Sequence, residues 1–512
     1  MGELDDYAIK KVAKGGFIIF VGIILLFVTT FFYKVIAARY FGPSDYGLLT
    51  LGITTLNIAT IFGLAGIHRS IGKLVNHYLA KKQYDKVKGV IVSSFIITAA
   101  FSALILLLLY YSSPFIEEKL FKIKGVSKII RIFSVGVPFS VLTQMLKYHF
   151  FAFKKPEYAI VSESISERMV NLVLLVLVIF ISASVYLVGW AYVASLAVSF
   201  IVGISILNSK VHKIIRKELK PKFDFRNIIS FSLPLMLTGV LGAALAWTDT
   251  IFIGIFKSDA DVGVYNAAYI LASALMIFWF SFGDIFYPII SELYSKKAKD
   301  SIRKTFEIAS RWIFIMSFPI FLVILIFPSA VISLLFGQNY REASIPLAIL
   351  IVGYFFITMF GLAEQGLIVF KKTKFLGIIT SVGFFVNIAL NIILIPLYGI
   401  AGAAIATTSS ILMITLLKLV YFKRILQFNY DKLLYFKFVC AGVIAFLITF
   451  YSFKLLWFPK MYLFLPALTA YFALYFILLV VFKSFSDEDI NVLEAVERKV
   501  GIKFTFIKKL LR

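Results

Sequence analysis

One short stretch of the chain places charged and hydroxyl side chains inside an otherwise apolar segment. It runs from Ser162 to Arg168 and includes Glu163 and Glu167, within an apolar segment of about residues 158–181. Each ionisable group costs at least ~2.5 kcal/mol at the centre of a bilayer. Three such groups within six residues therefore indicate either a functional site or a paired internal contact.

In a regular α-helix these side chains would form two neighbouring stripes. Ser164, Arg168 and Asn171 would share one stripe, and Glu163 and Glu167 would lie on the next. A helix entering the bilayer at the start of the segment would carry Arg168 about 18 Å deep, at ~1.5 Å per residue. That depth is roughly half of a ~30 Å hydrocarbon core. We interpret the stripes as the polar, partly cationic lining of a substrate cavity. The alternative is an internal ion pair that locks this helix to a neighbour.

The elements that position these groups must be membrane-spanning helices. The chain has 512 residues, of which 61% are hydrophobic and 17% aromatic, a balance that no soluble domain matches. In lipid the backbone must be hydrogen-bonded within its own segment, which favours helices. The net charge of +25 could suggest nucleic acid, but the basic residues fall mainly in short loops between apolar runs. We therefore expect an all-α polytopic membrane protein that binds no nucleic acid.

Cysteine usage limits the kinds of site that the chain can contain. The single cysteine, Cys440, lies in an apolar run, so the sequence offers no disulfide framework and no cysteine-based metal site. We expect no metal and no cofactor.

Apolar runs of about 20 residues predict fourteen transmembrane helices. Lys and Arg concentrate in the loops after even-numbered helices, which predicts a multi-pass protein of the cell (plasma) membrane with both termini in the cytoplasm. The loop from Lys119 to Arg131 is an exception, with five basic residues partly offset by Glu117 and Glu118, and we treat it as noise. The expected helices are residues 16–38, 46–68, 89–111, 129–151, 157–181, 184–207, 228–251, 264–287, 308–330, 343–369, 374–396, 400–422, 433–456 and 461–482.

A weak internal repeat predicts the architecture. Residues 135–136 (Val-Gly) and 153–155 (Phe-Lys-Lys) recur as residues 352–353 and 370–372 at one shared offset. Equal spacing of two matches makes coincidence improbable. Two pseudo-symmetric six-helix halves of the same orientation follow, with two helices appended. Parallel repeats of this kind usually form a two-lobed transporter with the substrate site between the lobes.

A second match relates residues 41–47, between the first two expected helices, to residues 257–265. The repeat then divides the chain into an N-terminal lobe, a cytoplasmic linker, a C-terminal lobe, two further helices and a cytoplasmic amphipathic tail. The corresponding residues are 1–207, 208–227, 228–424, 425–482 and 483–512.

Three short segments resemble a known family. Residues 38–47 read Ala-Arg-Tyr-Phe-Gly-Pro-Ser-Asp-Tyr-Gly, residues 249–254 read Asp-Thr-Ile-Phe-Ile-Gly, and residues 263–269 read Gly-Val-Tyr-Asn-Ala-Ala-Tyr. They resemble signatures of the polysaccharide flippases, the O-antigen-type exporters of lipid-linked oligosaccharides in the multidrug/oligosaccharidyl-lipid/polysaccharide superfamily. Phe41 stands where that family more commonly has Leu, which is a tolerable apolar exchange.

The resemblance implies a MATE-like fold and a transporter rather than an enzyme. Such a flippase would move a polyprenyl-(pyro)phosphate-linked oligosaccharide from the cytoplasmic to the outer leaflet by alternating access, for cell-surface polysaccharide or glycan biosynthesis. Its partners would be the lipid-linked oligosaccharide and membrane lipids, with glycosyltransferases of the same pathway as candidate partners.

A head group of this kind needs cations and hydrogen-bond donors in a closed cavity, while its isoprenoid tail stays in lipid. Arg168 is the strongest candidate and Lys147 the second, although Lys147 could instead extend to the inner membrane surface. Candidate sugar contacts are Ser164, Asn171, Gln144, Asn387 and Asn391. For each amide the alternative is a helix–helix hydrogen bond.

Acidic residues within the expected spans could bind Na⁺ or a proton and couple transport to an ion gradient. The candidates are Glu163, Glu167, Asp249 and Glu364, and we prefer the first two. The alternative for each is partnership with a neighbouring donor. The energy source stays open between a Na⁺ gradient, a proton gradient and the membrane potential.

Two other functions remain as alternatives. One is a multidrug or organic-cation exporter of the same superfamily, although that branch usually has twelve spans. The other, of a different class, is a membrane glycosyltransferase or polysaccharide polymerase, because Asp259-Ala260-Asp261 has the Asp-x-Asp form that can hold a metal. We favour a polar turn for this tripeptide.

Overall fold

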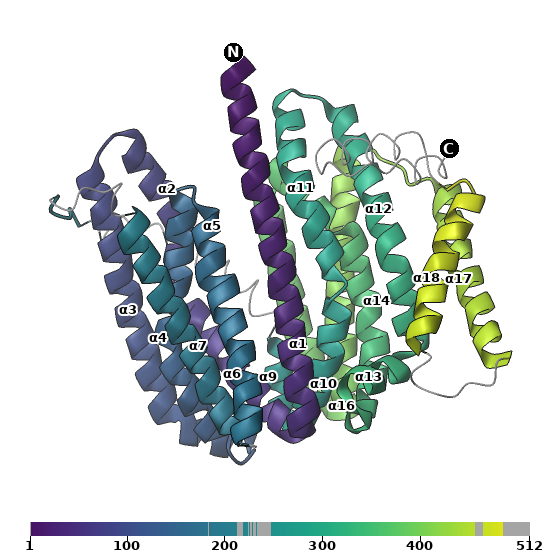
Figure 1. The fold of residues 1–512 in the computed structure, drawn as a ribbon, viewed down its shortest axis with the longest axis horizontal. Helices are drawn as coiled ribbons and strands as arrows, with labels where there is room; N and C mark the ends of the chain where they lie inside the picture. Colours follow the sequence, from purple (N-terminus) through teal and green to yellow (C-terminus); the bar gives the residue numbers. More distant parts are fainter. Residues whose placement is uncertain are drawn as a thin grey trace. The chain divides into compact units, whose positions relative to one another are not determined.

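The computed structural model describes residues 2–182, 184–211, 219–223, 225, 228, 232, 247–455 and 464–484, and every structural statement below concerns these residues. The side chains of residues 2–24, 69, 164, 210–211, 285, 453–455 and 464–465 fall outside this description. Half of the expected linker (208–227) and nearly all of the expected tail (483–512) lie outside it as well. Every regular element among the described residues is a helix, as the composition predicts (Figure 1).

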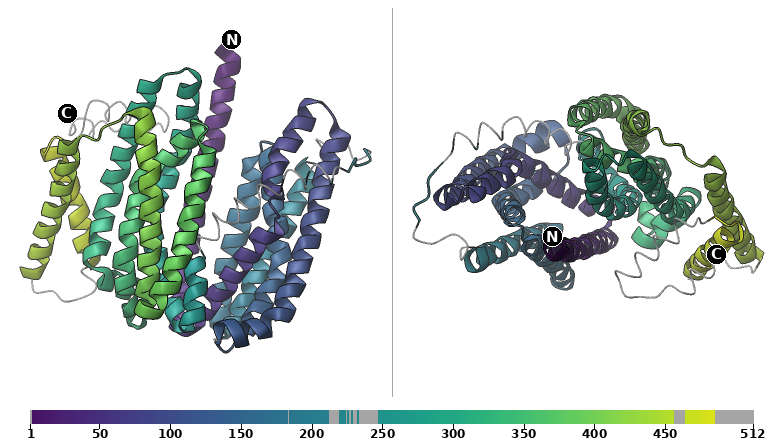
Figure 2. Two further views of the ribbon diagram at one scale, coloured as in Figure 1. Left: turned by 180° about the vertical axis from the view of Figure 1, so that it is seen from behind. Right: turned by 90° about the horizontal axis from the view of Figure 1, so that it is seen from above.

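In the first half of the chain, only a few residues separate each helix from the next in sequence (Figures 1 and 2). These helices are α1 (Gly2–Gly63), α2 (Ile67–Ala80), α3 (Tyr84–Phe115), η1 (Ile116–Phe121), α4 (Val126–Ala152), α5 (Pro156–Ala159), η2 (Ile160–Glu167), α6 (Arg168–Ile181), α7 (Val185–Ile206) and η3 (Leu207–Val211).

The second half continues after the segment that precedes Trp247. Its helices are α9 (Thr248–Phe256), α10 (Asp259–Ser273), α11 (Met276–Ser295), α12 (Lys299–Ile326), α13 (Pro328–Phe336), η4 (Gln338–Ala343), α14 (Ser344–Phe360), α15 (Leu362–Val369), α16 (Thr373–Leu426), α17 (Lys432–Leu455) and α18 (Phe464–Val481).

Ten helices within the described residues are long and apolar enough to cross a membrane. Two of them contain a non-helical glycine, Gly42 in α1 (φ 74°, ψ 177°) and Gly399 in α16 (φ 59°, ψ −138°). Glycine adopts a positive φ without steric penalty, so each long helix bends there and contains two of the expected spans. With the shorter apolar helix α18, the elements account for each expected span except the seventh. Residues 228–251 lie mostly outside the described part.

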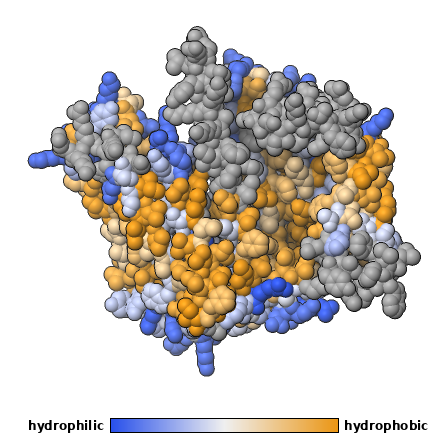
Figure 3. All heavy atoms as spheres, in the orientation of Figure 1, coloured by the Kyte–Doolittle hydropathy of each residue, from blue (hydrophilic) through white to orange (hydrophobic). Residues whose placement is uncertain are grey.

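An apolar belt crosses the middle of the face seen in Figure 3, and hydrophilic residues gather toward both ends of the helices. Large apolar side chains are exposed on several helices; Phe180 and Ile181 at the end of α6, for example, are 83% and 76% exposed. Such a surface is stable only against lipid. The chain is therefore a polytopic membrane protein.

Residue contacts divide the chain into two compact units that do not coincide with the two sequence repeats. Unit 1 comprises residues 1–274, 335–350 and 377–410, and unit 2 comprises residues 275–334, 351–376 and 411–512. Unit 1 thus combines the first repeat with α9, α10 and the first part of α16.

A reciprocal glycine contact joins α1 and α10 within unit 1. A methyl group on Gly47 would lie 1.8 Å from the Asp259 carbonyl oxygen, and one on Gly263 would lie 2.1 Å from the Pro43 carbonyl oxygen. Gly47 and Gly263 occupy equivalent positions in the match of residues 41–47 with 257–265. Next to them, the Ser44 hydroxyl donates a 2.6 Å hydrogen bond to Asp259. Small residues let two backbones approach this closely in a membrane.

Aromatic side chains fill the core of unit 2. The Phe306 ring of α12 lies 5.0 Å from the Phe422 ring of α16 and 4.7 Å from the Phe428 ring, and all three are fully buried. Offset and tilted ring contacts of this kind add to dispersion packing, which must hold helices together where lipid replaces water.

Candidate functional site

The charged stretch of the fifth expected span is a π-helix, not the regular α-helix that the stripe prediction assumed. It forms η2, between α5 and α6, in a continuous segment of 26 residues from Pro156 to Ile181. The wider turn leaves backbone carbonyls that serine hydroxyls bind: Ser166 donates to Val161 (2.8 Å), and Ser199 of α7 donates to Ser162 (2.6 Å). π-turns within α-helices often mark functional sites.

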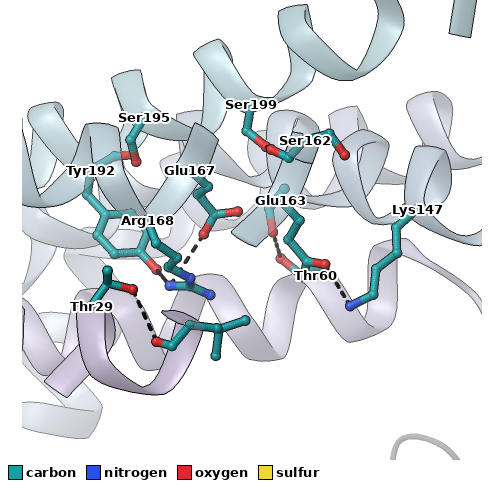
Figure 4. A network of polar contacts seen from close by, with 12 residues as sticks. Thr29, Thr60, Lys147, Ser162, Glu163, Glu167, Arg168, Tyr192, Ser195 and Ser199 are labelled. Carbon is teal, nitrogen blue, oxygen red and sulfur yellow. Dashed lines mark hydrogen bonds and ion pairs between the residues drawn. The ribbon is translucent and has the colours of Figure 1, made fainter. Parts of the chain in front are cut away.

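Arg168 begins α6 directly after this π-turn, at the middle of the spanning segment. Its Nη1 atom lies 3.4 Å from both Glu167 Oε1 and the Tyr192 hydroxyl of α7 (Figure 4). The Arg168 side chain is still 24% exposed, and its Nε atom has no hydrogen-bond partner among the described residues. The guanidinium is therefore only partly compensated.

Lys147 of α4 forms a second, shorter ion pair on the same side of η2. Its Nζ atom lies 2.7 Å from Glu163 Oε2, with the side chains 28% and 12% exposed (Figure 4). Gln144, half-buried on α4, lies about one turn before Lys147. The structure thus brings Lys147, Glu163, Glu167 and Arg168 into one group, which we call the Arg168 cluster.

Within the Arg168 cluster, Glu163 pairs with Lys147 and Glu167 with Arg168. Lys34 of α1 is half-buried and interacts electrostatically with Arg168 from a neighbouring helix. Sequence reasoning missed Lys34, which lies four residues before the expected end of its span. A lysine at that place usually extends to the membrane surface.

Two buried polar side chains lie near Arg168. Asn171 of α6 is 3% exposed, and its amide interacts with the Tyr33 hydroxyl of α1. The Ser164 side chain lies outside the described residues. The unpartnered Arg168 Nε and these polar groups leave this region able to receive an anionic, hydrogen-bonding group.

Asp249, in the first turn of α9, anchors a separate polar cluster in unit 1. Its carboxylate is buried and accepts hydrogen bonds from the hydroxyls of Tyr265 in α10 and Thr407 in α16. It also accepts one from Asn391 Nδ2 at 2.8 Å. Asn387 completes the group, since its Oδ1 accepts from Asn391 and its Nδ2 donates to Thr407, each at 3.1 Å.

This Asp249 cluster unites residues to which the sequence assigns different roles. Asn387 and Asn391 are expected sugar contacts and Asp249 an ion site, but the structure bonds all three to one another. The cluster offers carboxylate, amide and hydroxyl oxygens, the donor set that hard cations prefer. Asn391 Oδ1 is buried without a partner among the described residues, so one ligand atom is free.

Glu364, the remaining acidic candidate, lies in unit 2 beside a cation that sequence reasoning missed. Its Oε2 atom is 2.9 Å from Lys418 Nζ of α16, and the side chains are 35% and 11% exposed. The two charges balance locally. Like Lys34, Lys418 lies four residues before the end of its expected span, where a lysine usually extends to the membrane surface.

The Asp-x-Asp tripeptide forms a helix cap. Asp261 donates its backbone N–H to Ser258 Oγ and accepts the Ser258 backbone N–H, which is a capping box at the start of α10. Asp259 accepts from Ser44. Both carboxylates therefore have structural partners, as a polar turn requires.

The fold and these clusters define a polytopic helical membrane protein with charged groups inside its spans. Residues 12–294, more than half of the chain, match the family model for polysaccharide biosynthesis proteins, and the chain belongs to this family. Residues 234–393 also match the MatE model.

Three curated relatives cover different shares of the chain. An uncharacterised membrane protein of Methanocaldococcus jannaschii is 24% identical over 78% of this chain and 81% of its own length. A probable low-salt glycan biosynthesis flippase of Haloferax volcanii is 26% identical over 42% of this chain and 46% of its own. A putative O-antigen transporter of Shigella flexneri is 22% identical over 74% and 90%.

Solved structures confirm the MATE-like fold. The lipid II flippase MurJ in an inward closed conformation superposes with a TM-score of 0.74 at 15% identity, covering 91% of this chain and 98% of that protein. An inward-facing multidrug resistance MATE transporter gives 0.62 at 14% identity, covering 78% and 94%.

Proposed function

We propose that this protein is a flippase that moves a polyprenyl-(pyro)phosphate-linked oligosaccharide from the cytoplasmic to the outer leaflet. The family, the relatives named as a glycan flippase and an O-antigen transporter, and the shared fold with MurJ support it. Transport follows alternating access and serves cell-surface glycan biosynthesis. Glycosyltransferases that make the oligosaccharide supply its substrate at the cytoplasmic face, where we also place both termini.

The observation that carries this proposal is the Arg168 guanidinium at the middle of its span, which is 24% exposed and whose Nε has no hydrogen-bond partner among the described residues. A cation in a span is costly unless it is compensated, and the Arg168 contacts with Glu167 and Tyr192 are both long, at 3.4 Å. A diphosphate supplies further negative charge and accepts from the free Arg168 Nε. The isoprenoid tail needs no protein contact in lipid.

Arg168 provides the test. Arg168→Ala is expected to slow flipping of a lipid-linked oligosaccharide in liposomes at least about tenfold, because a charge-assisted, bidentate contact is lost. Arg168→Lys keeps the charge but not the planar fork of the guanidinium, so its flipping rate should lie between those of the native protein and Arg168→Ala. Arg341→Ala, which removes an exposed arginine of η4, is the matched control. Wild-type flipping by Arg168→Ala, at unchanged thermal stability, would refute the head-group role.

The incompletely compensated Arg168 guanidinium argues against export of organic cations, since a fixed positive charge repels such a substrate. The glycosyltransferase alternative loses its metal ligands, because Asp259 and Asp261 are engaged in the α1–α10 contact and the α10 cap. We therefore propose a transporter and not an enzyme.

We further propose that the Asp249 cluster couples transport to a cation, Na⁺ or H⁺. The buried Asp249 carboxylate and the free Asn391 Oδ1 support a site for a small hard cation. Either a bound Na⁺ or a proton on Asp249 would neutralise the charge of the carboxylate. We prefer this site to Glu163 and Glu167, whose carboxylates already pair with Lys147 and Arg168.

Asp249→Asn tests the coupling while keeping the side-chain shape. For the native protein we expect Na⁺, compared with K⁺, to raise the unfolding temperature if the ion is sodium, because ligand binding stabilises the folded state. If the ion is a proton, a pH gradient should drive flipping instead. Asp249→Asn should abolish whichever response is found, and Glu364→Gln should retain it. A response that survives in Asp249→Asn excludes this site.

A further inference from the structure

The loop between α3 and α4 carries the basic residues that oppose the general charge distribution. Lys119, Lys122, Lys124, Lys128 and Arg131 lie at the end of the helices opposite the linker, the side that the charge distribution assigns to the exterior. Lys and Arg in a short outer loop work against the orientation of the chain. Their retention there calls for a compensating role.

The loop is an ordered element. It begins with the π-helix η1, and Lys122 (φ 55°) and Gly125 (φ 91°) make left-handed turns that lead into α4. The Glu117 carboxylate accepts the Ser127 backbone N–H at 2.6 Å. Glu118 pairs with Lys119 at 2.9 Å. Both acids of the loop are thus engaged by partners other than Lys122, Lys124, Lys128 and Arg131.

Arg131 is held so that the end of its guanidinium stays available. Its Nε donates to Ser113 Oγ at 2.9 Å, and its guanidinium carbon lies 5.2 Å from the centre of the Tyr110 ring. Ser127 also donates to Ser113 Oγ, at 3.1 Å. An arginine fixed through Nε and a ring face presents its two Nη groups as a planar fork, which suits a phosphate.

The remaining three cations lie close to Arg131 in the chain. Lys128 rests 4.0 Å over the Tyr186 ring of α7, while Lys122 and Lys124 are exposed. Lys122 and Lys124 lie in the turn before α4, and Lys128 and Arg131, three residues apart, lie in its first two turns. Within the part of the chain that the structure describes, none of the four makes an ion pair. We call Lys122, Lys124, Lys128 and Arg131 the outer basic surface.

Exposed aromatic residues place this surface at the level of lipid head groups. Tyr110, Tyr111 and Phe115, at the end of α3, are 39%, 75% and 61% exposed. Tyrosine and tryptophan mark the boundary between hydrocarbon and water. A phosphate on a membrane lipid lies at that boundary, whereas a free polysaccharide or a soluble anion has no reason to stay there.

We propose that the outer basic surface binds the diphosphate head group of a polyprenyl-linked lipid in the outer leaflet. The identity of this lipid as the transported product rests on the proposed function. The cations hold the head group after it leaves the bundle, which favours release into the outer leaflet over return. The surface is distinct from the Arg168 cluster, which lies at the middle of a span.

Binding of farnesyl diphosphate to the full-length protein in phosphatidylcholine nanodiscs tests the surface. The variant K122Q/K124Q/K128Q/R131Q is expected to bind it at least about tenfold more weakly, since several charge-assisted contacts are lost. The matched control K81Q/K82Q/K220Q/K222Q removes four exposed lysines elsewhere and should change binding less than about twofold.

Three results would overturn the proposal. If K122Q/K124Q/K128Q/R131Q binds farnesyl diphosphate as tightly as the native protein, the outer basic surface does not hold the head group. If K81Q/K82Q/K220Q/K222Q loses as much affinity, the binding reflects general electrostatic attraction. Inorganic diphosphate binding as tightly as farnesyl diphosphate shows a site for free phosphate instead of a lipid. Failure of the proposed function would give a different result from failure of this inference. Arg168→Ala would then flip lipid-linked oligosaccharide at the native rate, while K122Q/K124Q/K128Q/R131Q would still lose farnesyl diphosphate binding.

Discussion

Arg168 shows how the state of one charged side chain depends on helices that are distant in sequence. Its own helix supplies Glu167, α7 supplies Tyr192, and α1 supplies the competing charge of Lys34. Neighbouring acids and cations together, and not depth alone, determine whether a buried charge is compensated. The residual charge is what makes the cluster a candidate anion site.

The Lys418–Glu364 pair of unit 2 gives a prediction about stability. Lys418→Met leaves the Glu364 carboxylate without a counter-charge and should destabilise the protein by about 2 kcal/mol, less than for a fully buried pair because Glu364 is 35% exposed. Thermal unfolding in detergent measures the effect. The double variant Lys418→Met/Glu364→Gln should recover more than half of the loss. Equal stability of the single and double variants would show that the pair is not coupled.

Ser199 allows a comparison with a matched neighbour. Its hydroxyl donates to Ser162 O in η2, whereas the equally buried Ser195 donates to Tyr192 O in its own helix. Ser199→Ala should reduce the free energy of unfolding by about 1 kcal/mol more than Ser195→Ala, because a carbonyl of the π-turn loses its donor. Similar unfolding temperatures for the two variants would show that the π-turn does not need this hydrogen bond.

At the scale of elements, irregular helix geometry coincides with the candidate sites. The π-turn η2 carries Glu163 and Glu167, and the positive-φ glycines Gly42 and Gly399 divide α1 and α16. A π-turn changes which side chains share a face, so the stripes expected from a 3.6-residue period do not hold between Ile160 and Glu167. The charges nevertheless meet because Lys147 and Tyr192 come from neighbouring helices.

The α1–α10 contact gives a prediction for this scale. Gly47→Ala or Gly263→Ala inserts a methyl group against a backbone carbonyl and should destabilise the protein by about 2–3 kcal/mol, since backbone cannot move aside as a side chain can. Gly377→Ala in α16, where a methyl group meets nothing within 4 Å, should instead be neutral or stabilise by up to ~1 kcal/mol. Detergent-based thermal unfolding compares them. A destabilised Gly377→Ala and a neutral Gly47→Ala would contradict the contact.

At the scale of the molecule, the boundaries between the two packed units differ from the boundary between the two sequence repeats. The sequence repeats divide near the linker, yet contacts group α9, α10 and part of α16 with the first repeat. The reciprocal glycine contact ties α10 to α1 of the first repeat, and the Asp249 cluster ties α9 to α10 and α16, which explains part of this grouping.

Orientation across the membrane can be measured directly. In a Cys440→Ser background, K81C and K122C lie near opposite ends of α3. In intact cells a membrane-impermeant maleimide should label K122C but not K81C, which reacts only after permeabilisation, because the basic loops are cytoplasmic. The reverse pattern would invert the topology. Labelling of both from one side would show that α3 does not span.

Much of the fold could be predicted from the sequence, because transmembrane helices are local features. Apolar length and composition place most spans outside the seventh within a few residues of a helix, and the motifs at residues 38–47 and 249–269 indicate the family. The eighth expected span, 264–287, instead straddles the break between α10 and α11. The glycine-containing turn at Gly42 is also local. These properties depend on neighbours along the chain, and lipid enforces them whatever the tertiary packing.

Only the tertiary structure decides which polar groups meet. Asp249 and Asn391 are 142 residues apart and bond directly, and Thr407, which no motif marks, completes their cluster. Lys34 and Lys418 become relevant only through Arg168 and Glu364. Such contacts depend on the rotation and register of several packed helices at once, which the apolar pattern of any one helix does not specify.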